Sequence, residues 1–198
     1  MANDATGCYD RIIVSLGMIA CRSLGMSQSA IRTQAELLRL MRYAMKHAYG
    51  ISEDEYQGTI FEPLFGTGQG SGSSPDIWLG LVVILLKAFD RMAAEDHITG
   101  FELEDPWNEI AAAWHVGAFV DDTNQGVTSS KGTQSQAELV ETLRQAGQMW
   151  ENLLLHIFGG ALNLSNCLWS LHFWEWHKGS TSCDDQRFQP GTYSHLSG

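Results

Sequence analysis

The chain has 198 residues, a length typical of one domain or slightly more than one. Its 12 Lys and Arg residues stand against 23 Asp and Glu residues, which gives a net charge of −11 with histidine neutral. A hydrophobic fraction of 44% with 18% charged residues provides enough apolar material for a core and excludes a disordered acidic tail. The acidic balance also argues against an autonomous protein that binds nucleic acid through a broad basic surface.

The cysteines and the apolar segments predict an intracellular protein. The four cysteines are too few and too widely spaced for a disulfide scaffold, so we expect reduced thiols at Cys8, Cys21, Cys167 and Cys183. The first ten residues carry acidic side chains and no basic leader, so no secretory signal is expected. The longest apolar run, 77–86, is half of the approximately 20 residues that span a bilayer. We therefore expect a cytoplasmic or nuclear protein without a membrane segment.

The first part of the chain predicts two helices. Apolar residues recur at helical spacing over 10–23, and Gly25 marks the end of this segment. Ser27 is placed to cap a second helix, and its apolar face comprises Ile31, Ala35, Leu38 and Met41. The stretch 43–51 is ambiguous between a helix end and a strand, whereas 52–57 predicts an acidic turn.

The middle of the chain contains a glycine-rich loop, a helix and a hairpin. The loop over 65–75 holds four glycines and three serines, and Pro75 is suited to the first turn of a helix over 76–94. The segment 100–108 predicts a loop or a short strand. An apolar strand is expected over 112–120, with a turn over 121–124 and a return strand over 125–127.

The last part predicts a long helix and a strand. The helix covers 133–156 and ends at the glycine pair that follows, and the strand covers 167–176. We expect a domain over 1–177 and a flexible tail over 178–198. This order of elements predicts an α+β fold in which helices pack on one face of an antiparallel sheet.

Paired acidic residues form the first candidate site. Asp121 and Asp122 follow an apolar strand, and their mutual repulsion is relieved if a divalent cation lies between them. A third carboxylate, Asp4, would complete a site for two metal ions, which stabilises the attacking and leaving oxygens in phosphoryl transfer. Taken alone, the pair favours the explanation that it is a solvated turn, because Asp favours turns.

The glycine-rich loop is the second candidate. Its glycines are compatible with a phosphate-binding loop or with a flexible linker. No lysine follows them as a P-loop requires, so the glycine spacing alone is a weak signal.

Four segments carry motifs in a particular order. An Asp is followed by an aromatic residue and a second Asp over 4–10, and Gly-Gln-Gly-Ser-Gly-Ser-Ser-Pro occupies 68–75. Phe-Val-Asp-Asp occupies 119–122, and Gly-Gly-Ala-Leu-Asn begins a segment over 159–167. In this order and at this spacing, the segments resemble the palm of a reverse transcriptase of the retrotransposon type. The resemblance covers nearly the whole chain.

The resemblance implies a polymerase palm-like antiparallel sheet and an RNA-directed DNA polymerase activity, a nucleotidyl transfer to a primer. It implies that Mg²⁺ or Mn²⁺ is held by three carboxylates, Asp4, Asp121 and Asp122. It implies contacts to the incoming nucleotide and the template from Tyr9, Gln69 and Gly70, and a structural role for Asp10. The implied partners are an RNA or DNA template with its primer, and dNTPs. It also implies a hairpin within 43–56.

Two departures from the family pattern bear on activity. The fourth motif usually carries a Lys, a candidate proton donor, where this chain has Asn166. Fingers and thumb segments are not recognisable, and a longer product could supply them. We therefore expect the isolated chain to be inactive. A non-catalytic remnant of a retroelement palm and an unrelated carboxylate metal-binding domain remain the alternatives.

The C-terminal Cys and His residues do not have the spacing of a zinc site. The tryptophans of the same region are suited to stacking on bases, yet are more typical of packing in a small sheet: Trp169, Trp174 and Trp176.

Overall fold

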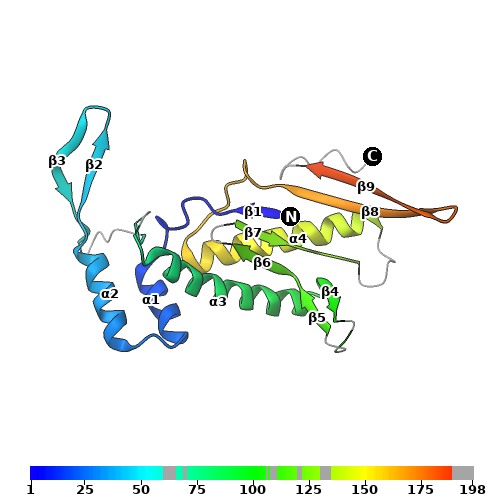
Figure 1. Ribbon diagram of the computed structural model, residues 1–198, viewed down its shortest axis with the longest axis horizontal. Coiled ribbons are helices and arrows are strands. Elements are labelled where there is room, and N and C mark those ends of the chain that lie inside the picture. The colour runs from blue at the N-terminus through cyan, green and yellow to red at the C-terminus, as the bar shows by residue number, and fades with distance from the viewer. Residues whose placement is uncertain are drawn as a thin grey trace. The chain divides into compact units, whose positions relative to one another are not determined.

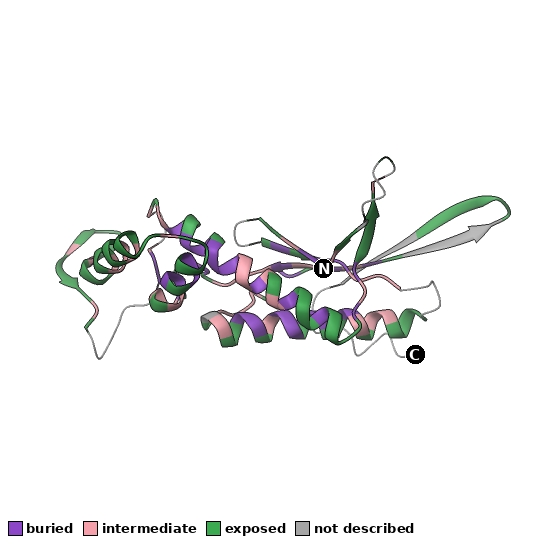
Figure 2. Ribbon diagram, turned by 90° about the horizontal axis from the view of Figure 1, so that it is seen from below, coloured by how far each residue is buried: buried purple, intermediate pink, exposed green. Residues whose placement is uncertain are grey.

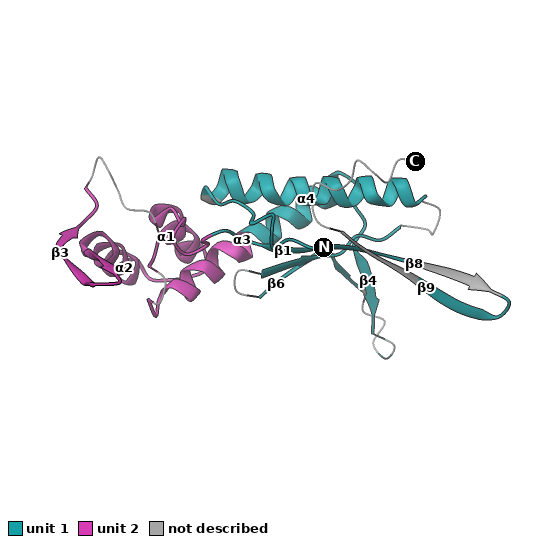
Figure 3. Ribbon diagram, turned by 90° about the horizontal axis from the view of Figure 1, so that it is seen from above, with its two compact units in different colours: residues 1–6, 85–198 teal, residues 7–84 magenta. Residues whose placement is uncertain are grey.

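The computed structural model describes residues 1–59, 66–68, 71–105, 107, 111–119, 122–129 and 135–188. Helices and antiparallel strand pairs make an α+β fold, as the sequence predicts. The chain divides into two compact units (Figure 3). The first unit comprises residues 1–6 and 85–198, and the second comprises residues 7–84. No helix of the described residues has the length and apolar character needed to cross a membrane.

A three-stranded antiparallel sheet lies at the centre of the first unit. Its strands follow the order β1-β7-β6, with the bounds β1 (Ala2–Asp4), β7 (Asp122–Gln125) and β6 (Val116–Phe119). Thr123 and Gln125 of β7 are buried, whereas Asp122 and Asn124 are exposed. Because side chains alternate between the faces of a strand, one face of this sheet packs inward and the other is open.

Helices cover the inner face of the sheet. The unit contains α4 (Gln136–Phe158) and the second part of α3 (Ser74–Glu95), and buried and exposed residues alternate along both (Figure 2). Phe89 of α3 meets Trp150 of α4 edge to face, with ring centroids 5.8 Å apart. Both side chains are buried, so this aromatic pair joins the two helices in the core.

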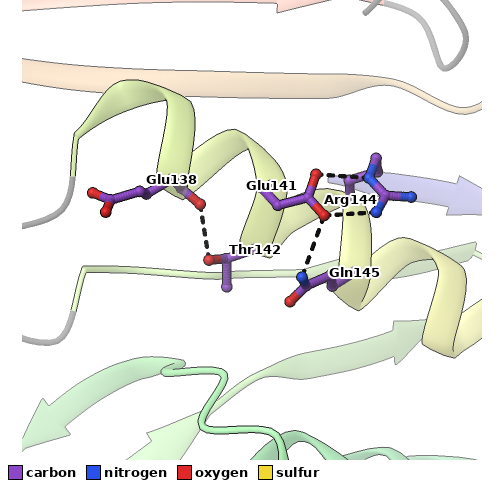
Figure 4. Close-up of polar contacts among 5 residues, drawn as sticks. All are labelled: Glu138, Glu141, Thr142, Arg144 and Gln145. Carbon is purple, nitrogen blue, oxygen red and sulfur yellow. Dashed lines mark hydrogen bonds and ion pairs between the residues drawn. The ribbon is translucent and has the colours of Figure 1, made fainter.

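Helix α4 has defined signals at both ends. The Ser135 hydroxyl accepts a hydrogen bond from the Glu138 backbone, and the Glu138 carboxylate accepts one from the Ser135 backbone, which together form a capping box. Gly159 ends the helix in the left-handed conformation with φ 68°. On the exposed face, Glu141 accepts hydrogen bonds from Arg144 and Gln145 (Figure 4). The helix predicted over 133–156 is therefore present as 136–158, and its predicted end at the glycine pair is confirmed.

Two further strand pairs belong to the first unit. They are β4 (Phe101–Glu104) with β5 (Ala111–Trp114), and β8 (Trp169–His177) with β9 (Ser180–Phe188). The start of β8 packs against α4, where a Cβ at Gly147 would lie 3.0 Å from the Trp169 ring. A glycine on α4 therefore permits the close approach of the indole to the helix.

Three predictions for this unit need correction. The single strand expected over 112–120 is two strands, because β5 pairs with β4 while β6 pairs with β7. Residues 122–124 of the expected turn lie in β7 instead, because the ladder between β6 and β7 extends as far as the pair Phe119 and Asp122. The tail expected from residue 178 is a strand as far as Phe188, because β9 pairs with β8 along its length.

The second unit contains two helices, a hairpin and the first part of α3. The helices are α1 (Val14–Ser23) and α2 (Gln28–Leu40), and the hairpin is β2 (Tyr43–His47) with β3 (Gly50–Tyr56). The predicted cap is confirmed, since the Ser27 hydroxyl accepts a hydrogen bond from the Ala30 backbone. The acidic turn predicted over 52–57 is wrong, because these residues lie mostly in β3. The hairpin expected within 43–56 is present.

Candidate functional site

Asp4 and Asp122 come together across the β1–β7 ladder. They are directly opposite one another in the antiparallel register, after the pairs Ala2 with Asn124 and Asn3 with Thr123. Opposite residues of an antiparallel pair point to the same face, with Cβ atoms about 4.5–5.5 Å apart. Asp122 is exposed and Asp4 is half-buried, so both carboxylates belong to the open face of the sheet.

The third predicted carboxylate lies outside the described residues. In the sequence, Asp121 directly precedes Asp122, the first residue of β7. The described residues contain no group of three or more His, Cys, Asp or Glu side chains arranged to hold a metal ion. The structure therefore brings together two of the three predicted carboxylates, Asp4 and Asp122.

An aromatic side chain continues the same row of the sheet. Phe119 of β6 is the register partner of Asp122, so Phe119, Asp122 and Asp4 lie side by side on three neighbouring strands. The Phe119 ring is 77% exposed. The open face therefore presents an apolar ring beside two carboxylates.

A turn that follows α4 holds the carboxylate of Asp4. Asn163 and Asn166 each donate a side-chain amide hydrogen bond to Asp4 Oδ2, over 3.2 Å and 2.8 Å. The Asn163 backbone N–H also donates to the Asp4 carbonyl over 2.8 Å. The sequence marks Asn166 as a substitution for Lys and predicts no contact for it. Asn163 belongs to the fourth motif, so the sequence could have drawn attention to it, but the motif predicts no role for its side chain.

A buried thiol lies next to this turn. Cys167 is 2% exposed, and burial raises the pKa of its thiol. The negative charges of Asp4 and Glu151 act in the same direction, while a hydrogen bond with the Asp4 backbone opposes them. Because a nucleophilic cysteine needs the thiolate, this environment disfavours covalent chemistry at Cys167. The candidate chemistry at this face is therefore the binding of a cation by the carboxylate oxygens of Asp4 and Asp122.

Tyr9 and the glycine-rich loop lie in the second unit. Tyr9 is half-buried, and its ring meets Trp78 edge to face with centroids 6.3 Å apart. The Tyr9 carbonyl accepts a hydrogen bond from the Thr67 backbone over 2.8 Å. A Cβ at Gly66 would lie 2.7 Å from Asp10 Cα, so only glycine fits this approach. Tyr9 and Asp10 of the first motif therefore lie against Gly66 and Thr67, which directly precede the second motif.

Two of the predicted nucleotide-binding residues, Gln69 and Gly70, lie outside the described residues. The loop on either side of them is anchored by Ser74, whose hydroxyl donates to the carbonyl oxygens of Thr67 and Gly68 over 3.0 Å and 2.9 Å. Ser74 is buried and begins α3, so it ties the glycine-rich segment to the start of that helix.

Comparison with family models, curated proteins and solved structures finds no match for this chain. The open face of the sheet and the four motifs are therefore the features on which a function can be based.

Proposed function

We propose that this chain is the palm part of an RNA-directed DNA polymerase, in which Asp4, Asp121 and Asp122 bind Mg²⁺ or Mn²⁺ for nucleotidyl transfer. The observation that carries the proposal is the register of β1 and β7, which sets Asp4 directly opposite Asp122 on an open face. Like charges directly opposite each other destabilise a sheet. A divalent cation between the two carboxylates would remove that repulsion.

The donor set fits a hard cation. Mg²⁺ is usually bound in proteins through one or two carboxylates and retains several water molecules. Asp4 and Asp122 supply two carboxylates on one face, and Asp121 directly precedes Asp122 in the chain. Ions held by these carboxylates would supply stabilisation of the charge on the attacking and leaving oxygens. The role of the protein would be to hold the carboxylate oxygens that bind the ions in fixed positions.

The resemblance assigns the remaining binding roles. Tyr9 would contact the sugar of the incoming nucleotide, and Gln69 and Gly70 would contact the nucleotide and the template. The packing of Gly66 and Thr67 against the backbone of Tyr9 supports a common role for the two motifs. Phe119 is exposed beside Asp122 and offers an apolar contact at the same face.

The partners under this proposal are an RNA or DNA template with its primer, and dNTPs. A net charge of −11 opposes binding to a polyphosphate backbone, because such affinity depends on Lys and Arg. We propose that fingers and thumb segments of a longer product supply those charges. Under this proposal, the protein acts in the cytoplasm or the nucleus.

A second candidate function has a specific observation in its favour. Asn166 stands where the family has Lys, and its amide is bonded to Asp4. A neutral amide does not serve as a general acid, a role that typically contributes about 10²–10⁴-fold to a rate. The chain would then be a non-catalytic palm remnant that still binds metal.

Metal-dependent nucleotide binding tests the leading proposal. We expect a dNTP to bind the chain in the presence of Mn²⁺, measured by equilibrium dialysis, and to bind much more weakly to Asp4→Asn and Asp122→Asn. Asp96→Asn is the matched control, because Asp96 is an exposed carboxylate at the end of α3 in the same unit. Equal nucleotide binding by the wild type and Asp122→Asn would contradict the proposal. Mn²⁺ binding without nucleotide binding would favour the remnant or an unrelated metal-binding domain.

A further inference from the structure

One oxygen of the Asp4 carboxylate is fully occupied within the protein. Oδ2 accepts hydrogen bonds from Asn166 Nδ2 at 2.8 Å and from Asn163 Nδ2 at 3.2 Å. Two donors use both lone pairs of a carboxylate oxygen. Oδ1 has no hydrogen-bond partner among the described residues, so the two oxygens of Asp4 are not equivalent.

The two amides are themselves held in place. The Asn163 backbone N–H donates to the Asp4 carbonyl, and its side-chain Oδ1 accepts a hydrogen bond from the Ser165 hydroxyl over 2.7 Å. The Asn166 backbone N–H donates to the Asn163 carbonyl over 2.9 Å, which closes the turn. This accounts for the orientation of the Asn163 amide, because its carbonyl oxygen is bonded to Ser165 and its NH₂ group is directed to Asp4.

We propose that Asn163 and Asn166 are positioning residues that fix the Asp4 carboxylate and leave Oδ1 as the oxygen that binds the divalent cation. This inference rests on the proposed function, since it concerns the same metal site. Hydrogen-bond partners of metal ligands orient those ligands, and their loss typically lowers metal affinity by about 10–100-fold. The turn after α4 therefore belongs to the site although it supplies no ligand.

The neutrality of the amides matters for this role. A lysine ammonium beside Asp4 would also orient the carboxylate, but it would place a positive charge next to the cation site. An amide orients the carboxylate without that repulsion. Asn166 would thus strengthen metal binding relative to the Lys that the family usually carries, and Asn166→Lys should bind Mn²⁺ more weakly than the wild type.

The decisive variant is Asn166→Leu, which removes the donor and keeps the number and branching of the side-chain heavy atoms. Asn166 is exposed, so this change leaves the core intact. We expect its Mn²⁺ affinity to fall by about 10–100-fold, measured by electron paramagnetic resonance of free Mn²⁺. Asn166→Gln keeps an amide donor and should recover part of the loss. Asn152→Leu is the control, because it makes the same change at an exposed position of α4.

A metal-free measurement isolates the hydrogen bonds. The side-chain amide signals of Asn163 and Asn166 in a ¹⁵N correlation spectrum should shift in Asp4→Ala and stay in place in Asp122→Ala. Equal Mn²⁺ affinity of Asn166→Leu and the wild type would overturn this inference and leave the proposed function standing. Absence of Mn²⁺ binding by the wild type would overturn the proposed function, and this inference with it.

Discussion

Asp4 and Asp122 are register partners on adjacent antiparallel strands, and their side chains share the open face of the β1–β7–β6 sheet. Two like charges in this relationship weaken the strand pairing unless something between them compensates. The sheet keeps both carboxylates on its open face, where a cation can reach them. This arrangement leads to a prediction about metal affinity.

Metal affinity should depend on the adjacent carboxylates of Asp121 and Asp122. We expect the wild type to bind Mn²⁺, and Asp121→Asn and Asp122→Asn each to bind it about tenfold more weakly or worse, because ligand charge sets affinity at such sites. Isothermal titration calorimetry with Mn²⁺ measures the difference. Asp96→Asn should titrate like the wild type, and identical affinities for all the proteins would rule out the metal site.

The 198-residue chain should show negligible primer extension on an RNA template, even with Mg²⁺ and all four dNTPs. Its 12 basic residues against 23 acidic ones give little affinity for the primer–template phosphates. Asn166→Lys should not rescue extension, because a general acid does not replace missing duplex binding. Incorporation of labelled dNTP is the measurement, with the double variant Asp121→Asn/Asp122→Asn as the blank.

Robust extension by the wild-type chain that is abolished in the double variant would contradict this prediction. It would make the chain a complete minimal polymerase.

The capping box of α4 should make its stability depend on pH. The pKa of Glu138 lies below its ordinary value of 4.5, because its carboxylate accepts hydrogen bonds from the Ser135 backbone and hydroxyl. A lowered folded-state pKa means that the stabilisation is complete above pH 4.5 and is lost as the pH falls through the folded-state value. Thermal melts by circular dichroism at about pH 7 and about pH 3 should show this loss.

Glu138→Gln is the control for that prediction, since glutamine also serves in a capping box and does not titrate. Its melting temperature should change less between the two pH values than that of the wild type. A wild type and a Glu138→Gln variant with the same pH dependence would show that other groups determine the effect. The exposed pair of Glu141 with Arg144 contributes in the same direction, because Arg144 lowers the pKa of Glu141 (Figure 4).

Two glycines with positive φ should differ in their tolerance of alanine. Gly25 has φ +101° with nothing within 4 Å of an added Cβ, so Gly25→Ala should cost about 1–2 kcal/mol of unfolding free energy. Gly66 has φ +92°, and an added Cβ would lie 2.7 Å from Asp10 Cα. We expect Gly66→Ala to cost roughly 1–3 kcal/mol more, because a backbone atom cannot move aside easily.

Urea unfolding of both variants tests this difference. Equal losses of free energy would mean that the contact between the glycine-rich loop and the Tyr9 turn is looser in solution. A larger loss in Gly66→Ala would support the close packing of Gly66 against Tyr9 and Asp10.

Local signals in the sequence determine much of this fold. The ends of α4 follow from Ser135, Glu138 and Gly159, and the start of α2 follows from Ser27, since each signal acts over a few residues. Figure 1 shows both helices in their order along the chain. The sequence alone also identifies the residue types of the candidate site, two adjacent Asp residues and the earlier Asp4.

Only the tertiary structure decided which of these residues meet. Asp4 lies opposite Asp122 because β1 pairs with β7 in one register, and a shift of one residue would turn either side chain to the other face. The division of 112–120 into β5 and β6, and the strand β9 in place of a tail, likewise depend on pairing partners that local propensity does not specify. The contact of Asn166 with Asp4 joins residues that are 162 positions apart in the chain. Periodicity and capping act over a few residues, whereas this contact exists only because the fold returns the chain from α4 to the edge of β1.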